Sequence, residues 1–463
     1  MDRILQSLAS EVFLRRPVLS DIFERFGQKS VFDYVQSWGV TPGQPRAVFL
    51  QQLYQLVTEE YGEETAISLQ NQLHQLPLVS TIDHHGLLNH PFFLNANFIY
   101  SLHTDIQHCI CLTTAGISLN NSSWPGCLVY DEVGKQQRIS LFREACKHQT
   151  VLGLTPFTNT DIDVASHRAA EGRVRELLEV CRGQITDKEQ LFWQQAGRAS
   201  TVLWNKFFPS APKISYIPIE ILTNRIIIEL LKTNDPIFSL LLCSVEGHKL
   251  ITRYFQGMDG AFSSTGKGSF LYWGLCKGKR VSLSDAQDTF IGGNLSFPYA
   301  KEKLINAMEN TEIYPTSLLC FMVMLYCNIT CLGGFNQVTW LAEIQKQFIL
   351  LLRELGLSEA ALSVEKVIVN NFSESNLVFM NKGMSVIQAS GVDIFCQGKS
   401  AMYERYVRLS HRITVAESVT SALPEMYRVV VPVGERNEKL LAITQTDIAT
   451  HLGLPKKIAI EFS

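Results

Sequence analysis

The side chains best suited to chemistry gather in one short stretch of the chain. Five of the eleven histidines fall within it, and the first two belong to the run Asp83-His84-His85-Gly86. Imidazole titrates near neutral pH and is the commonest metal ligand, and a neighbouring carboxylate can orient it for proton transfer. We therefore expect a catalytic group in which His84 or His85 is the general base or a ligand and Asp83 orients it. The five histidines are His84, His85, His90, His103 and His108.

Polar residues that could bind a substrate follow this run. His90 precedes Pro91, and the loop that begins at Asn120 and Asn121 continues with two serines. We expect His90, Asn120, Asn121 and Ser122 to contact a substrate. The alternative for these histidines is structural, because a histidine can also cap a helix or cross-link loops.

A second polar segment, Asp259-Gly-Ala-Phe-Ser-Ser-Thr-Gly-Lys-Gly-Ser269, resembles a phosphate-binding loop only in part. Position 261 is Ala where that loop needs Gly, and Gly268 follows Lys267 where Ser or Thr is needed. Consecutive backbone N–H groups can still bind an anion, with Lys267 as a point charge, so Lys267 is a candidate substrate ligand. The alternative is a plain loop that leads into the next hairpin.

Carboxylates and imidazoles together also make a candidate site for Zn, Mn or Mg. Asp83, His84, His85, Asp161 and Asp163 supply enough ligands, although no strict ligand spacing is present. The sequence leaves the cofactor open, with a divalent cation as one candidate.

The triplet also resembles a family signature. Asp-His-His followed by Gly, after a predicted strand, is similar to the motif of the DHH phosphoesterases, manganese-dependent enzymes that cleave phosphoesters or pyrophosphate. That family completes a two-metal site with an earlier His/Asp motif and carries a later Gly-Gly-Gly-His element. Here the nearest analogue of the first motif, 159–167, comes after the triplet, and the second does not occur. The resemblance implies metal-assisted hydrolysis, and the order of the motifs departs from the family pattern.

Composition narrows the class of partner. The formal net charge of −3 gives no overall electrostatic reason to bind nucleic acid or an anionic membrane. The eleven cysteines are scattered through apolar segments, which is typical of reduced thiols in the cytoplasm, and the first residues do not resemble a secretion signal. Residues 313–342 carry no charged side chain or histidine, and we interpret their apolar part, 316–331, as a buried helix instead of a membrane span. We expect a cytoplasmic protein with a small-molecule substrate, no nucleic-acid partner and no membrane contact.

The elements that must position the histidines form a predicted strand–helix–strand unit. Residues 78–82 and 108–114 are rich in β-branched residues and end at turns, and 91–103 is a helix with Pro at its first position. Such a unit forms a parallel crossover, whose strand ends are a usual place for ligands. Asp83 and His84 would then lie beside Thr113, Thr114 and Gly116.

Other elements follow from periodicity and turn residues. We expect helices over 165–208, 219–232 and 337–356, a strand over 213–217 and a hairpin over 269–283. From about 364 we expect short strands at 366–369, 377–380, 384–388 and 427–433. Residues 443–454 resemble the first helix of a DNA-binding helix-turn-helix, but 455–463 reads as a strand, which argues against that motif.

The predicted fold class is α+β, with mixed α/β as the alternative: a helical N-terminal subdomain, then a mixed sheet with packed helices. The expected regions are 1–76 (helical), 77–210 (α/β, with the histidines), 211–360 (mainly helical, with the hairpin) and 361–463 (α+β). The leading hypothesis is an enzyme, a hydrolase or transferase acting on a small polar or phosphorylated metabolite. The alternative is a binding or interaction protein in which the histidine cluster is structural.

Overall fold

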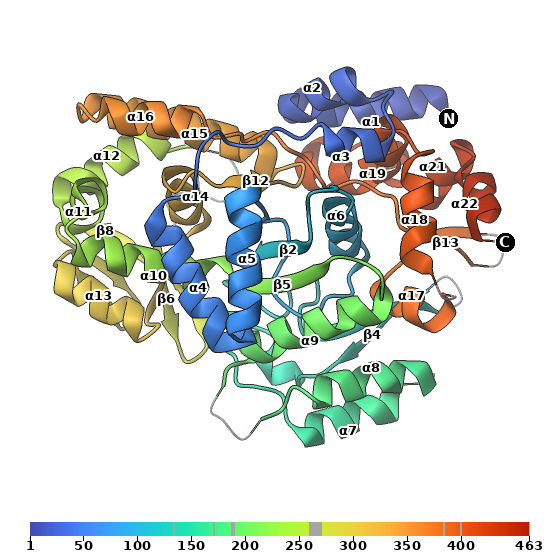
Figure 1. Ribbon diagram of the computed structural model, residues 1–463, viewed down its shortest axis with the longest axis horizontal. Coiled ribbons are helices and arrows are strands. Elements are labelled where there is room, and N and C mark those ends of the chain that lie inside the picture. The colour runs from blue at the N-terminus through green and yellow to red at the C-terminus, as the bar shows by residue number, and fades with distance from the viewer. Residues whose placement is uncertain are drawn as a thin grey trace.

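A parallel four-stranded sheet lies at the centre of the molecule, with helices packed around it (Figure 1). The computed structural model describes residues 1–132, 135–169, 172–186, 190–258, 271–382, 385–398 and 401–462. The strand order is β12-β1-β2-β5, and every neighbouring pair is parallel. The strands are β1 (Leu78–Ser80), β2 (His108–Thr113), β5 (Lys213–Pro218) and β12 (Thr330–Leu332). The fold is mixed α/β, the class that the sequence analysis gives as the alternative to α+β, and the predicted N-terminal helices and central sheet with packed helices are present.

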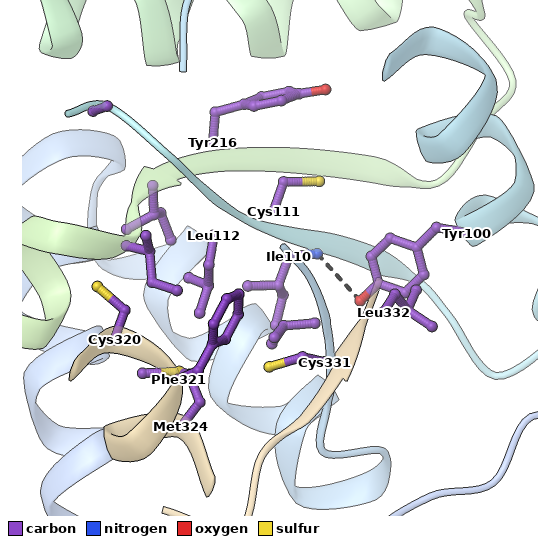
Figure 2. Packing of buried hydrophobic residues seen from close by; sticks show 14 of the residues in the cluster. Tyr100, Ile110, Cys111, Leu112, Tyr216, Cys320, Phe321, Met324, Cys331 and Leu332 are labelled. Atoms are coloured by element: carbon purple, nitrogen blue, oxygen red, sulfur yellow. Dashed lines mark hydrogen bonds between the residues drawn. The ribbon is translucent and has the colours of Figure 1, made fainter. Parts of the chain in front are cut away.

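The sheet forms where it does because its strands can be buried on both faces. Every residue of β1, β2 and β12 is buried. Ile110 and Leu112 of β2 face Phe321 and Met324 of helix α14 (Ser317–Tyr326), and Cys111 lies on the opposite side of the strand with Tyr216 of β5 (Figure 2). Alternate residues of one strand thus contribute to two separate layers of the core.

The strand–helix–strand prediction around the histidines is confirmed. Helix α6 (Pro91–Ser101) connects β1 to β2, and Ser80 is in register with Cys111 across the parallel pair. Because all four strands of the sheet run the same way, their carboxyl ends meet at one edge. The segments that leave this edge start at Thr81, Thr114, Ile219 and Gly333.

The N-terminal helices are also confirmed, and they pack against distant parts of the chain. Helix α1 contacts α19 (Val415–Val430), and α4 contacts α10 (Ile219–Lys232). The N-terminal helices are α1 (Asp2–Arg15), α2 (Pro17–Phe26), α3 (Val31–Gln36), α4 (Ala47–Tyr61) and α5 (Glu63–Gln75).

Small antiparallel sheets and further helices surround the central sheet. The predicted hairpin is present as β6 (Tyr272–Cys276) and β7 (Lys279–Ser282), and β11 (Ile313–Pro315) pairs with β6. The other strands are β3 (Cys127–Glu132), β4 (Lys135–Ser140), β8 (Ser284–Ala286), β9 (Thr289–Gly292), β10 (Leu295–Pro298), β13 (Phe379–Lys382) and β14 (Ser385–Gln388). The other helices are α7 (Asn159–Arg168), α8 (Gly172–Arg182), α9 (Phe192–Phe207), α11 (Pro236–Cys243), α12 (Val245–Phe255), α13 (Lys301–Glu309), α15 (Gln337–Glu354), α16 (Ser358–Glu365), α17 (Gly391–Gln397), α18 (Met402–Ser410), α20 (Glu438–Leu441), α21 (Gln445–His451) and α22 (Leu454–Phe462).

The predicted long helix over 316–331 is only partly correct. Helix α14 ends at Tyr326, Asn328 adopts a left-handed φ of 61°, and the chain then enters β12. A left-handed residue breaks a right-handed helix, and Thr330 and Cys331 complete the central sheet instead. The interpretation of α14 itself as a buried helix is confirmed. Within the described ranges, every helix is too short or too polar to cross a bilayer.

Three predictions for the C-terminal region are wrong. Residues 427–430 end helix α19, whose buried Leu423, Met426 and Val430 follow helical spacing, and 366–369 form no strand. The segment after Gly453 is helix α22, not a strand. The predicted strand over 455–463, which argued against a helix-turn-helix, is therefore absent. In the structure Leu454 and Ile458 of α22 are buried against the protein, and the Lys457 ammonium binds Glu417 at 2.6 Å.

Candidate functional site

A cleft of about 910 Å³ opens at the carboxyl edge of the central sheet. Residues that follow all four strand ends line it, among them His84 after β1, Gly116 after β2, Glu220 after β5 and Gly334 after β12. Its volume is in the range of sites that enclose small molecules. Aromatic side chains make up much of the wall: Phe92, Phe93, Trp273, Tyr314, Phe321, Phe335 and Trp340.

The backbone after β1 stays extended and separates the members of the Asp-His-His triplet. The Thr114 amide donates to the Asp83 carbonyl at 2.8 Å, and the His85 amide donates to the Thr114 carbonyl at 2.8 Å. Side chains alternate along extended backbone. Accordingly Ile82 and His84 line the cleft, whereas Asp83 and His85 are only 1% and 0% exposed and do not line it.

His84 is the triplet member that reaches the cleft. Its Nδ1 lies 2.9 Å from the Ser123 hydroxyl, which lies 2.8 Å from Oδ1 of Asn121. An amide oxygen only accepts, so the Ser123 hydroxyl donates to Asn121 and the His84 Nδ1–H donates to Ser123. Burial lowers the pKa of His84 to about 4. The imidazole is therefore neutral at pH 7, and its Nε2 lone pair is bonded by none of the described residues.

Gly86 allows the backbone after His84 to lie directly against Pro125. A Cβ on Gly86 would lie 2.6 Å from the Cα of Pro125, closer than real Cβ atoms approach a backbone. The Leu87 amide donates to the Pro125 carbonyl at 2.9 Å. The loop that carries Ser123 is thereby fixed against the turn that carries His84.

His85 has a structural role. Its Nε2–H donates to the Trp193 carbonyl at 2.7 Å, so Nδ1 of the neutral ring accepts from the Thr113 hydroxyl at 2.6 Å. Burial lowers the pKa of His85 to about 4, which keeps the ring neutral. With both nitrogens bonded, His85 links β2 to helix α9 and has no lone pair to offer a substrate.

Asp83 is buried beside the sheet rather than in the cleft. Its Oδ2 accepts from the Asn97 amide at 2.7 Å, and its Oδ1 has no hydrogen-bond partner among the described residues. Burial raises the pKa of this carboxyl from 3.8 to about 7. The structure therefore does not place Asp83 where it could orient the His84 ring.

The remaining clustered histidines divide between the cleft and the core. His90 lines the cleft and caps helix α6, because its Nδ1 accepts from the Phe92 amide at 3.3 Å. His108 is bonded at both ring nitrogens, to Ser68 at 3.3 Å and Ser215 at 2.9 Å. His103 is buried and stacks on Trp38, with its Nδ1 accepting from the Asp105 amide.

Only some residues of the polar loop after β2 line the cleft. Ser122 is exposed and lines the cleft, and Asn121 positions Ser123. Asn120 lines a neighbouring groove instead of the cleft. Lys267 lies outside the described residues.

The five candidate metal ligands are not brought together. Asp161 caps helix α7 by accepting from the Thr158 amide and hydroxyl, and exposed Asp163 pairs with Arg182 at 2.7 Å. The described part of the chain contains no group of three or more His, Cys, Asp or Glu side chains that could hold a metal ion. The metal ligands that the family signature implies therefore do not fit this structure, because His84 faces the cleft whereas Asp83 and His85 face the interior.

Three carboxyl groups in the cleft were not predicted: those of Glu220, Glu374 and Glu425, of which Glu425 pairs with Arg428 at 3.7 Å. Glu220, in the first turn of α10, accepts from the Gly116 amide at 2.8 Å, and burial raises its pKa to about 7. Glu374 accepts from the Phe335 amide at 2.7 Å, and burial raises its pKa to about 8. Glu220 could have been found, since it follows a predicted strand as that strand becomes a helix. Glu374 lies in a connecting segment without any such signal.

The cleft also receives the positive ends of several helices. Helices α6, α10, α14 and α15 begin at it, through Pro91, Glu220, Ser317 and Gln337. A helix N-terminus carries unpaired N–H groups and a partial positive charge that favours anionic groups. Arg280 and Arg428 line the same cleft.

Comparison with known proteins assigns no family: the sequence matches no protein-family model and no curated protein sequence at a significant level. The function must therefore be argued from the cleft itself.

Proposed function

We propose that this protein is an enzyme that acts on a small polar or phosphorylated metabolite by hydrolysis or group transfer, with His84 as its general base. One observation carries the proposal. In a cleft of ligand size, a neutral imidazole is held by Ser123 through Nδ1, while its Nε2 lone pair is left unbonded by the described residues.

The chemistry follows from the protonation states of two groups in the cleft. At pH 7 His84, with a pKa of about 4, is unprotonated and can accept a proton from water or a substrate hydroxyl at Nε2. Glu374, with a pKa of about 8, holds its proton at pH 7 and can donate it to a leaving group. Two groups of one cleft whose pKa values are moved in opposite directions are typical of acid–base chemistry. The Asn121–Ser123 hydrogen bond keeps the His84 ring in one orientation through the proton transfer.

The walls of the cleft favour a polar, anionic substrate. First-turn residues of helices α6, α10, α14 and α15 line the cleft, where the partial positive charge of a helix N-terminus favours an anion, and Ser122 and Gln337 supply further polar atoms. The aromatic wall can exclude water from the reacting groups, which strengthens every electrostatic interaction inside. A small metabolite with a carboxylate or phosphate group fits both features.

The alternative, a non-enzymatic binding protein, rests on the histidines of the core. His85 and His108 each use both ring nitrogens for hydrogen bonds within the protein, as a structural cluster would. The two proposals differ at His84, whose loss should matter little to a protein that only needs the cluster for folding.

The test is a substrate screen with matched variants. The purified protein is incubated with pools of phosphorylated and carboxylated metabolites, and products are followed by ³¹P and ¹H NMR. Any turnover found is then measured in His84→Gln and in His74→Gln, which changes an exposed histidine outside the cleft. We expect His84→Gln to lose about 10²- to 10⁴-fold in kcat, the usual contribution of a general base, at an unchanged melting temperature. Full turnover in folded His84→Gln would exclude His84 as the base, and no turnover with any pool would favour the binding protein.

A further inference from the structure

A second cavity, of about 730 Å³, lies on the other side of the Asn120–Trp124 loop from the cleft. The hairpin β3–β4, the turn around Glu144 and helix α7 enclose it. Its lining includes several basic side chains: Arg138, Arg143, Lys147, His148 and Arg168. We call this cavity the basic groove.

The positive charge of the basic groove is not compensated locally. Its two acidic residues are occupied, since Glu144 binds the Lys147 ammonium at 2.6 Å and Asp161 caps α7. Arg138, Arg143 and Arg168 make no ion pair with any carboxylate in the part of the chain that the structure describes. The chain as a whole carries a net charge of −3, so three uncompensated guanidinium groups in one cavity are a local exception.

One of these arginines is oriented before any ligand arrives. The Arg138 guanidinium lies 3.8 Å from the centroid of the Trp124 ring. Stacking on an aromatic face fixes the plane of the guanidinium and leaves its N–H edge available, and that edge matches two phosphate oxygens. Trp124 itself has a left-handed φ of 52°, which is unusual for a bulky residue.

The basic groove also has an apolar part. Leu119, Leu141 and Phe142 line it, and Val164 of α7 is 46% exposed there. An inorganic ion would leave this surface uncovered, whereas a ligand with an organic portion would bury it. The volume of the groove is also larger than a lone phosphate needs.

We propose that the basic groove binds an organic phosphate of nucleotide size. Its phosphate groups bind Arg138, Arg143 and Arg168, and its organic portion covers the apolar surface beside Phe142. This site is separate from the cleft that holds His84, and the proposal does not depend on the cleft being catalytic.

The experiment is isothermal titration calorimetry at low salt with ATP, inorganic pyrophosphate and adenosine as probes. The variant Arg138→Gln/Arg143→Gln/Arg168→Gln removes the three charges of the groove. The control Arg3→Gln/Arg25→Gln/Lys29→Gln removes three positive charges from exposed positions elsewhere. We expect ATP to bind the unaltered protein and the control with equal affinity, and the groove variant to lose at least ten-fold in ATP affinity. Pyrophosphate should bind the unaltered protein more weakly than ATP does, and adenosine should not bind. Because ion pairing is screened, the ATP affinity should also fall as salt is added.

Equal ATP affinity in the groove variant and the control would overturn the proposal. So would a groove-dependent affinity for a single-stranded oligonucleotide in the absence of any for ATP, because the groove would then serve a polymer backbone. If the groove variant does not fold, Arg138→Lys/Arg143→Lys/Arg168→Lys keeps the charge and removes the planar fork. Weaker ATP binding by that variant supports the proposal, and unchanged binding contradicts the assigned role of the guanidinium groups.

Discussion

The buried carboxyl of Asp83 gives the sharpest prediction for stability. It is 1% exposed, one of its oxygens has no hydrogen-bond partner among the described residues, and no cation in them pairs with it. Burial raises its pKa from 3.8 to about 7. We predict that Asp83→Asn, which imitates the protonated acid and cannot ionise, makes the protein more stable than the original chain at pH 8 but not at pH 4.

The sign follows from proton linkage. A carboxyl whose pKa is higher in the folded state than in the unfolded state binds its proton more tightly when the protein is folded. Its contribution to the free energy of unfolding is therefore complete below the unfolded pKa and is lost as the pH rises through the folded pKa. A difference of about 3 pKa units, at about 1.4 kcal/mol each, corresponds to about 4 kcal/mol between pH 4 and pH 8. Asn at this position should not show that loss.

The assay is urea denaturation of both proteins at intervals between pH 4 and pH 8. The quantity compared is the difference in the free energy of unfolding, which cancels the titration of all other groups. Asp21→Asn is the control, because it removes the same charge at an exposed position. A difference between Asp83→Asn and the original chain that stays constant from pH 4 to pH 8 would refute the reasoning, and so would a growing destabilisation by Asp83→Asn.

Three further predictions concern the residues around the cleft. His85→Ala removes two buried hydrogen bonds and leaves the Trp193 carbonyl without a donor. The free energy of unfolding, measured by urea denaturation, should therefore fall by about 3 kcal/mol. An unchanged free energy of unfolding would contradict the structural role of His85. The pH profile of kcat/KM should rise above about pH 4 as His84 loses its proton and fall above about pH 8 as Glu374 loses its proton. Glu374→Gln should lower the plateau of this profile and remove the fall above pH 8. If the fall above pH 8 is unchanged in Glu374→Gln, another group causes it. Gly334→Ala places a methyl group against the Glu374 carboxyl, so we expect kcat to fall and the alkaline limb to shift while circular dichroism stays the same; an unaltered profile would show that Glu374 takes no part.

Local patterns were sufficient to predict the part of the fold that positions His84. Residue types alone favour the observed conformations here: β-branched residues favour strands before Asp83 and after Gln107, and Pro91 favours the first position of a helix. The C-terminal predictions failed where a local pattern is ambiguous. The apolar run from Tyr427 suits a strand by composition, yet it completes the buried face of a helix that began at Val415, and only tertiary packing decides between the two.

The candidate site could be predicted only where its residues are close in sequence. His84 and Ser123 come from one strand–helix–strand unit and the loop after it, so their proximity follows from the crossover. Glu374 reaches the cleft from a segment that follows helix α16, and its raised pKa comes from burial that no local pattern reports. Asn121 stays a predicted substrate ligand, and the hydrogen bond that its amide oxygen accepts from Ser123 has no signal in the sequence.

Parity along the backbone explains why adjacent histidines with the same chemistry have different roles. In extended backbone, residues one apart face opposite sides and residues two apart share a side. His84 therefore shares the cleft with Ile82, and His85 shares the interior with Asp83. For the same reason three consecutive side chains of this triplet cannot converge on one ion while the Thr114 pairing holds the backbone extended. The histidine that does share the cleft with His84 is His90, six positions on, and the Phe93 ring packs against both, with its centroid 5.3 Å from that of His84 and 5.4 Å from that of His90. The two histidines of the run that line one cleft are thus His84 and His90, which the turn at Gly86 and the start of α6 place there, and not the pair adjacent in sequence.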